Sequence, residues 1–278
     1  MISRRRIFKI AALASLAPIL PSCAKDASSE AGPEEKQPDP ALFQNGDFVW
    51  PKNPADYVPY VARPEPQRPD QEALDEALWE TERKEYLRSL SGQSKLDPLD
   101  EERKSLLEKM TFREFLDRYE SNRQRGETTE TQIRRLYVGH VGILEIDAEH
   151  RPWVIEAVWK VGVRRIAYSQ WIEQRKDDWV WLGRLNERSA EDRDKISAEA
   201  TKYLGRPYKF FDFNLNDDSG FYCSKLVWLS IYRSLNQFAV DGNENPRRVF
   251  WFSPKQLLSA KAAKHVFDPA PYRMSAPL

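Results

Sequence analysis

Cysteine is scarce in this chain, which makes Cys223 informative: two cysteines and three histidines occur in 278 residues. Cys223 lies where a polar loop ends and an apolar stretch typical of a buried helix begins, and Ser219 or Asp218 is placed to cap that helix. The thiolate is the nucleophilic form of cysteine, and a helix N-terminus stabilises it. Cys223 is therefore a candidate nucleophile. The alternative role is that of a small buried core residue, which most cysteines have.

His140 is the candidate base for this nucleophile. The alternation of apolar residues predicts that it lies inside a strand, flanked by Gly139 and Gly142. Glycines in a strand often mark the close approach of another chain segment, and here they clear space around the imidazole ring. A core histidine with satisfied hydrogen bonds is the alternative interpretation.

Glu156 is the candidate third member of the site. It lies on the next predicted strand between apolar neighbours, where an unpaired buried charge would be costly. A hydrogen bond to the His140 imidazole would satisfy both groups and fix the ring tautomer. A salt bridge to Arg164 or Arg165 is the alternative. Taken together, the three residues supply base, orienting group and nucleophile in the chain order His, Glu, Cys.

The composition excludes several classes of function. Lys and Arg number 43 and Asp and Glu also number 43, a balance that argues against a nucleic-acid-binding protein. Four Cys and His ligands at zinc spacing are not present in the sequence, so we expect neither a metal nor a cofactor. Hydrophobic residues make up 41% of the chain, enough for a substantial core.

The first 23 residues have the pattern of an export signal. A basic start is followed by an apolar run over 10–20, which is too short to span a bilayer as a stable helix. The segment 3–9 resembles a twin-arginine signal, with the ordinary secretory route as the alternative. Leu20-Pro21-Ser22-Cys23 resembles a lipobox, which predicts acylation of Cys23. We therefore expect an exported, lipid-anchored protein of the cell envelope, at the outer membrane or in the periplasm of a Gram-negative cell.

The remaining sequence divides into a tether and one domain. Residues 24–42 are polar and rich in Pro, Glu and Asp, so they are predicted to be a flexible tether, and the domain spans 43–278. Strands are predicted at 46–50, 136–145, 153–158, 162–166 and 179–185. Helices are predicted at 71–90, 100–110, 111–119, 189–204 and from 223, with a short one opening at Ser253.

At this point the motifs resemble those of a known group, the permuted papain-like hydrolases of the NlpC superfamily, in particular its YiiX/YebB-like branch. The matching segments are Gly46-Asp47-Phe48-Val49, Gly139-His140-Val141-Gly142-Ile143, Val154-Ile155-Glu156-Ala157, Gly205-Arg206-Pro207-Tyr208 and Phe221-Tyr222-Cys223-Ser224-Lys225-Leu226-Val227. Their order along the chain follows that of the group. Two features depart from it: a helical insertion at 71–125, and Lys225, where an acidic or polar residue is expected.

The resemblance implies an α+β fold, a circularly permuted papain-like domain whose antiparallel sheet packs on the nucleophile helix. It implies acyl transfer through Cys223, His140 and Glu156. Tyr208, Tyr222 and Trp153 are candidates to line the substrate groove, with a role in the core as the alternative. The expected substrates are amide bonds in cell-wall peptides. Two alternatives stay open: an acyltransferase or lipid hydrolase on the same fold, and an envelope-binding lipoprotein without catalytic activity.

Overall fold

The computed structural model describes residues 35–52, 69–115, 139–236, 254, 257 and 262–269. The predicted signal peptide, Cys23 and residues 24–34 of the predicted tether lie outside the described residues. So do residues 116–125 of the predicted insertion and most of the short helix predicted from Ser253. None of the helices in the described part of the chain is both long and apolar enough to cross a membrane.

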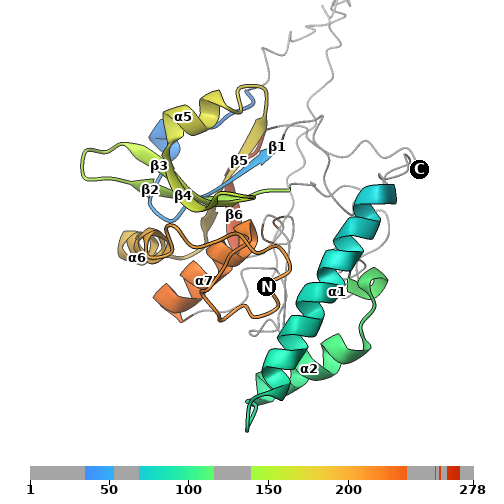
Figure 1. Ribbon diagram of the computed structural model, residues 1–278. Helices are drawn as coiled ribbons and strands as arrows, with labels where there is room; N and C mark the ends of the chain where they lie inside the picture. Colours follow the sequence, from blue (N-terminus) through green and yellow to red (C-terminus); the bar gives the residue numbers. More distant parts are fainter. Residues whose placement is uncertain are drawn as a thin grey trace, which may run out of the picture. The chain divides into compact units, whose positions relative to one another are not determined.

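A single antiparallel sheet organises the described part of the chain (Figure 1). Its strands are β1 (Phe48–Lys52), β2 (Gly142–Ile146), β3 (Pro152–Val158), β4 (Gly162–Ala167), β5 (Trp179–Leu185) and β6 (Ala263–Phe267). They are arranged in the order β4-β3-β2-β1-β5-β6, and each neighbouring pair is antiparallel. The predicted α+β fold with an antiparallel sheet is confirmed.

Helices cover both faces of this sheet. α6 (Ala190–Thr201) and α7 (Cys223–Leu235) lie on one side and α5 (Tyr168–Glu173) on the other (Figure 1). The larger core lies on the α6 and α7 side, where Leu226, Val227 and Ile231 of α7 are fully buried. The run of apolar residues from Cys223 correctly predicted that α7 is a buried helix, because a helix that is hydrophobic on most sides must be buried.

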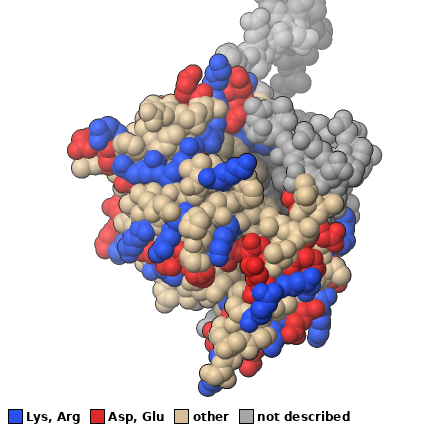
Figure 2. Space-filling model, in the orientation of Figure 1, with Lys and Arg blue, Asp and Glu red and all other residues tan. Residues whose placement is uncertain are grey.

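The predicted insertion is helical where it is described. It forms α1 (Pro69–Ser91) and α2 (Pro98–Lys109), and Thr111 and Glu114 make the expected reciprocal capping contacts at 2.8 and 3.2 Å. Acidic and basic side chains are interspersed over these helices, as expected for solvated faces (Figure 2). Leu74 of α1 is 64% exposed, whereas Trp79 on the same helix is fully buried and packs it onto the core.

The start of the domain also differs from the prediction. The backbone carbonyl of Lys36 accepts a hydrogen bond from Val180 N at 2.9 Å, and the Gln37 side chain donates to the carbonyl of Arg175 at 3.0 Å. A short 3₁₀ helix, η1 (Pro40–Leu42), follows. Residues 36–42 therefore pack on the domain instead of belonging to the tether, because their backbone extends the hydrogen bonding at the start of β5.

Besides η1, two elements were missed by the sequence analysis, α5 and β6. Both are short, and β6 is an edge strand with exposed residues in its centre, so neither shows the periodicity that identifies a longer element.

We predict that Trp79→Ala lowers the free energy of unfolding by about 3–5 kcal/mol, as large-to-small substitutions of buried aromatic residues do. The Trp79 ring contacts Phe213, Phe112 and Phe115, so its loss would leave a cavity among three aromatic rings. Chemical denaturation measures the effect. The matched control is Leu74→Ala on the same helix, which should change stability by about 0.5 kcal/mol or less. Equal effects of the two substitutions would contradict the burial of α1 through Trp79.

Candidate active site

The central contact of the site is a hydrogen bond between His140 and Glu156. His140 Nε2 lies 2.7 Å from Glu156 Oε2, and Glu156 is fully buried whereas the His140 side chain is 24% exposed. His140 was predicted to lie inside a strand, but it precedes β2, which begins at Gly142. The ring is therefore held by its carboxylate partner and not by the ladder of the sheet.

Gly142 provides the space for this contact. A Cβ at this position would lie 2.7 Å from a methyl group of Val154 and 3.6 Å from the Cβ of Glu156. Any larger residue would therefore push β3 away from β2 at the point where Glu156 is located. The predicted close approach at this glycine is confirmed.

Cys223 is the first residue of α7 and is a free cysteine, 6% exposed. Its sulfur lies 4.0 Å from the carbonyl oxygen of Gly139, the residue before His140, and the thiol lies near enough to the imidazole to raise the pKa of His140. Because Nε2 of His140 is occupied by Glu156, Nδ1 is the ring nitrogen left for the thiol. The three predicted site residues, His140, Glu156 and Cys223, therefore lie next to one another in the structure.

The predicted capping of α7 was wrong. The N-cap residue is Tyr222, and no side chain of the described residues caps this terminus. The two candidates, Ser219 and Asp218, belong to the loop before α7 and lie too far from the helix start to cap it. Ser219 instead hydrogen bonds to Asp217, and Asp218 forms an ion pair with Arg233 at 2.7 Å. The positive end of the helix dipole is therefore directed at the region of the thiol without a neutralising side chain.

The electrostatics of the site favour a protonated imidazole. Burial opposes the charge on His140, but the neighbouring Cys223 side chain, together with the hydrogen bond and charge of Glu156, raises its pKa to about 9. Burial likewise opposes the charge on Glu156. Its hydrogen bond to His140, the His140 charge and Arg175 nevertheless hold the pKa of the carboxyl well below its usual range. The carboxylate is thus ionised at neutral pH and supports an imidazolium.

Glu156 has three further partners. Arg164 donates to Oε1 from Nε and Nη2 at 2.9 and 2.6 Å, and Trp171 Nε1 donates to Oε2 at 2.9 Å. Arg175 Nη2 is 3.5 Å from Oε2. Glu156 therefore makes both of the contacts that the sequence analysis gave as alternatives, the hydrogen bond to His140 and the salt bridge to Arg164. Trp171 and Arg175 come from α5 and its C-terminal end, so the sequence analysis missed these two residues together with the helix.

A second buried ion pair lies just beyond the nucleophile. Lys225 Nζ is 2.5 Å from Asp212 Oδ2 and 2.9 Å from the carbonyl oxygen of Gly220. Lys225 is fully buried and Asp212 is 7% exposed, and burial raises the pKa of Asp212 and lowers that of Lys225. This lysine, unexpected from the sequence, fixes the loop that leads into Cys223.

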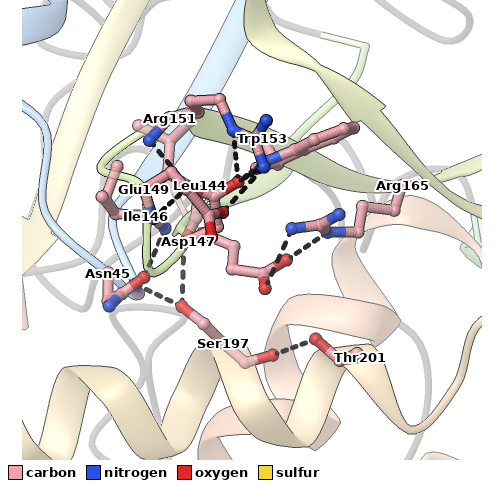
Figure 3. A network of polar contacts seen from close by, with 12 residues as sticks. Asn45, Leu144, Ile146, Asp147, Glu149, Arg151, Trp153, Arg165, Ser197 and Thr201 are labelled. Carbon is pink, nitrogen blue, oxygen red and sulfur yellow. Dashed lines mark hydrogen bonds and ion pairs between the residues drawn. The ribbon is translucent and has the colours of Figure 1, made fainter.

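Trp153 does not lie at the site. It is three residues before Glu156 on β3, which corresponds to about 10 Å along a strand. Its Nε1 donates to Asp147 at 2.8 Å, and the Arg165 guanidinium lies 3.8 Å from its ring centroid (Figure 3). Arg165 also pairs with Glu145 at 2.6 Å, so this network stabilises the β2–β3 hairpin at the opposite end of the sheet from His140.

The two predicted tyrosines have different surroundings. Tyr222 is 1% exposed and belongs to the core, which is the alternative that the sequence left open. Tyr208 is half-buried, and its backbone forms a bridge with Phe221, two residues before Cys223. Tyr208 also contacts the ring of Trp159, a residue that the sequence analysis did not single out and that is 57% exposed.

The described residues contain no group of three or more His, Cys, Asp or Glu side chains arranged to hold a metal ion. The chemistry of the described site is that of an ionisable thiol beside an imidazole and a carboxylate, the set of groups used for covalent acyl transfer.

Comparisons with known proteins find similarity to one described family. Residues 121–244 match the model of a family described as "Permuted papain-like amidase enzyme, YaeF/YiiX, C92 family", a range that contains His140, Glu156 and Cys223. The uncharacterized protein YiiX of Escherichia coli strain K12 is 37% identical over 119 residues, which cover 42% of this chain and 55% of that protein. The chain thus matches about half the length of that relative.

A solved structure is also similar, with 24% sequence identity and a TM-score of 0.40 over 53% of this chain and 93% of the other. Its title is "Crystal structure of metalloprotein yiiX from Escherichia coli O157:H7, DUF1105". The family match and the YiiX relative are in line with the predicted resemblance to the YiiX-like permuted papain-like group.

We predict that Glu156→Gln lowers any acyl-transfer activity of this site by about 100-fold, because the neutral amide no longer stabilises the imidazolium. The loss of the carboxylate charge lowers the pKa of His140 from about 9, so the alkaline limb of the pH–activity profile moves to lower pH. The control is Glu145→Gln on the neighbouring strand, whose partner is Arg165 and which should keep the wild-type profile. An unshifted alkaline limb in Glu156→Gln would contradict the assigned role.

The same contact predicts how stability depends on pH. The folded pKa of His140 is about 9, whereas the imidazole of the unfolded chain titrates near 6.5, the ordinary value for histidine. The stabilising contribution is therefore complete below about pH 6.5 and is lost as the pH rises through about 9. Urea unfolding of the wild type and of Glu156→Gln across this pH range measures this contribution. The difference in unfolding free energy between the two proteins should shrink toward pH 9.5. A difference that stays constant with pH would contradict the linkage.

We also predict that Lys225→Met lowers the free energy of unfolding by about 3 kcal/mol or more, because it leaves the Asp212 carboxylate buried without its cation. Combining it with Asp212→Asn should recover part of the loss. The control is Arg233→Met on the same helix, whose pair with Asp218 is about one third exposed and should contribute at most about 1 kcal/mol. Similar losses for both single variants in thermal unfolding would contradict the burial of the Lys225 pair.

Proposed function

We propose that this chain is a cysteine hydrolase that cleaves amide bonds through Cys223, His140 and Glu156. The single observation that carries the proposal is the placement of a buried carboxylate, an imidazole and a thiol next to one another. Glu156 hydrogen bonds to His140 at 2.7 Å, and Cys223 at the start of α7 lies near enough to the imidazole to raise its pKa. The match of residues 121–244 to a family of amidases supports the same reaction class.

The proposed reaction has two stages. The Cys223 thiolate adds to the carbonyl carbon, the C–N bond breaks, and the His140 imidazolium transfers its proton to the leaving amine. His140 then takes a proton from water, and the resulting hydroxide attacks the thioester. The C–S bond breaks, the carboxylic acid leaves, and the thiolate–imidazolium pair is restored. The backbone N–H of Cys223 at the helix start is placed to donate to the oxyanion.

Glu156 acts through His140. Its ionised carboxylate fixes the ring with Nε2 occupied, so that Nδ1 is presented to the sulfur, and it stabilises the imidazolium that the first stage requires. Arg164 and Trp171 hold the carboxylate itself in place, which leaves little freedom for the ring to turn away.

The location and the substrate are further parts of the proposal. The signal-like residues 1–23 and the lipobox-like Leu20-Pro21-Ser22-Cys23 support export and a lipid anchor on Cys23. An enzyme anchored in the cell envelope meets peptides of the cell wall, which are therefore the first proposed substrates. An acyltransferase or lipid hydrolase remains the second, because the same covalent chemistry serves both.

We predict that the reaction of Cys223 with iodoacetamide, in full-length protein carrying Cys23→Ser, depends on His140 at neutral pH. An imidazolium beside the sulfur favours the nucleophilic form of a thiol, and the His140 pKa of about 9 means that the ring is charged at pH 7. His140→Ala should lower the second-order rate constant at pH 7 by at least about tenfold. Mass spectrometry of the alkylated chain measures both rates.

The matched control is His265→Ala, which removes another histidine that has a carboxylate partner, Asp268 at 3.2 Å, on the edge strand β6. It should leave the rate unchanged. Equal rates and pH profiles for wild type and His140→Ala would overturn the activated pair, and the chain would then be better described as an envelope-binding lipoprotein. Digestion of muropeptides, with Cys223→Ala as the inactive control, then tests the proposed cell-wall substrates.

A further inference from the structure

Two features distinguish this chain from the group that its motifs resemble, the helical insertion and Lys225, and the loop before α7 connects them. The ends of this loop are joined to each other. Tyr208 forms a backbone bridge with Phe221, and Phe221 N donates to the carbonyl oxygen of Pro207 at 3.0 Å. Residues 209–220 therefore form a loop that is closed at its base, two residues before Cys223.

The insertion holds this loop through aromatic rings. Phe213 contacts Trp79 and Tyr86 of α1, with ring centroids 6.4 and 6.2 Å apart. Phe115, which also belongs to the insertion, contacts both Phe213 and Phe211, at 6.3 and 5.7 Å. Phe211 is 2% exposed and Phe213 is 1% exposed, so the loop is anchored in the insertion by large buried side chains.

Asp212 lies between these two anchored phenylalanines. Its Oδ1 accepts a hydrogen bond from Asn214 N at 3.1 Å, and its Oδ2 accepts one from Lys225 Nζ at 2.5 Å. Lys225 Nζ also donates to the carbonyl oxygen of Gly220 at 2.9 Å. One lysine in the first turn of α7 thus binds the middle of the loop and its end.

Burial makes this contact necessary for Lys225. The lysine is fully buried, and a buried ammonium group without a carboxylate partner is strongly destabilising. Asp212 is the carboxylate in direct contact with it, whereas Asp217 adds a weaker attraction and Lys209 a weaker repulsion. A shift or rotation of α7 would separate Lys225 from Asp212, and this cost fixes the start of the helix, where Cys223 lies.

We infer that the helical insertion positions the nucleophile: the insertion holds Asp212, and Asp212 holds Lys225 and with it the start of α7. The inference rests on the proposed function, because it concerns how Cys223 is kept beside its base. Asp212 and Lys225 are positioning residues that act through the place of Cys223. The two unusual features of the chain are then parts of one device, since a buried lysine at position 225 requires a carboxylate that is itself held in place.

The test measures how strongly the alkylation of Cys223 depends on His140. In full-length protein carrying Cys23→Ser, the rate constant with iodoacetamide at pH 7 is divided by the rate constant of the same protein with His140→Ala. A general loss of stability acts on both rate constants alike, so this His140 ratio reports the placement of the thiol beside the imidazole.

Phe213→Leu weakens the contact between the loop and the insertion, and it should lower the His140 ratio by about threefold or more. The matched control is Phe48→Leu. Phe48 is a fully buried phenylalanine of β1 whose ring contacts Trp50, and its substitution should keep the wild-type ratio.

A second variant removes the ion pair without leaving a buried charge unpaired. Lys225→Met combined with Asp212→Asn should retain more stability than Lys225→Met alone. It should nevertheless lower the His140 ratio as Phe213→Leu does, and adding Phe213→Leu to it should change the ratio little, because both act on the same link. A role in stability alone would keep the ratio wherever the fold is kept.

Hydrogen exchange of residues 220–230 measures the attachment of α7 without reference to His140. Mass spectrometry should find faster exchange of this segment in Phe213→Leu than in Phe48→Leu, because only the first substitution releases the loop that holds the helix start.

The outcomes separate this inference from the proposed function. Equal His140 ratios and equal exchange in Phe213→Leu and Phe48→Leu would overturn the inference. A wild-type ratio in the variant without the ion pair would overturn it as well, since the link would not pass through Lys225. Alkylation that does not depend on His140 in the wild type would instead overturn the proposed function, and the exchange rates would then decide whether the insertion holds α7.

Discussion

The structure of the site depends on a carboxylate that is ionised inside the protein. Glu156 is fully buried, and an isolated carboxylate there would be far too costly, so each oxygen must find donors. Arg164 satisfies one oxygen, and His140 and Trp171 share the other. The hydrogen bond from the imidazole therefore offsets part of the cost of burying this carboxylate. Moving the ring would leave the charge with fewer donors, and this cost is what keeps His140 at a fixed position beside Cys223 although the residue lies outside the strand.

This constraint explains the arrangement of the elements around the site. β3 carries Glu156 and pairs with β4, which supplies Arg164 directly opposite in the register, while α5 brings Trp171 from the far side of the sheet. α7 approaches from the other side and places Cys223 at its first turn. The buried pair of Lys225 with Asp212 holds the loop before α7 through the Gly220 carbonyl. The nucleophile therefore comes from a helix on one face of the sheet, and the carboxylate that holds the base has a partner on the other face.

How far the sequence predicted this arrangement differs from residue to residue. His140, Glu156 and Cys223 could be predicted because each is a chemically demanding residue in an apolar setting, and few alternatives exist in a chain with so few cysteines and histidines. The cap of α7 was mispredicted because residues of a loop can compete for local partners. Trp153 was wrongly predicted to line the substrate groove, because the position of a residue on a strand does not reveal which end of that strand lies near the site. Trp171 could not be predicted, since its helix is too short to show periodicity and its contact with Glu156 is set by tertiary packing.

The charge balance around Glu156 gives the thiol its role in this arrangement. The Glu156 carboxylate lies 2.6 Å from the guanidinium of Arg164 and 3.5 Å from the guanidinium of Arg175. It also contacts the His140 imidazole, whose pKa is about 9. With the imidazole protonated, positive groups outnumber the carboxylate in this cluster, and the N-terminus of α7 adds a further partial positive charge. A thiolate at Cys223 offsets this excess, whereas a neutral serine or alanine would not. The positive surroundings would equally stabilise the oxyanion that forms when the sulfur adds to a carbonyl, because the negative charge moves from sulfur to oxygen within the same field.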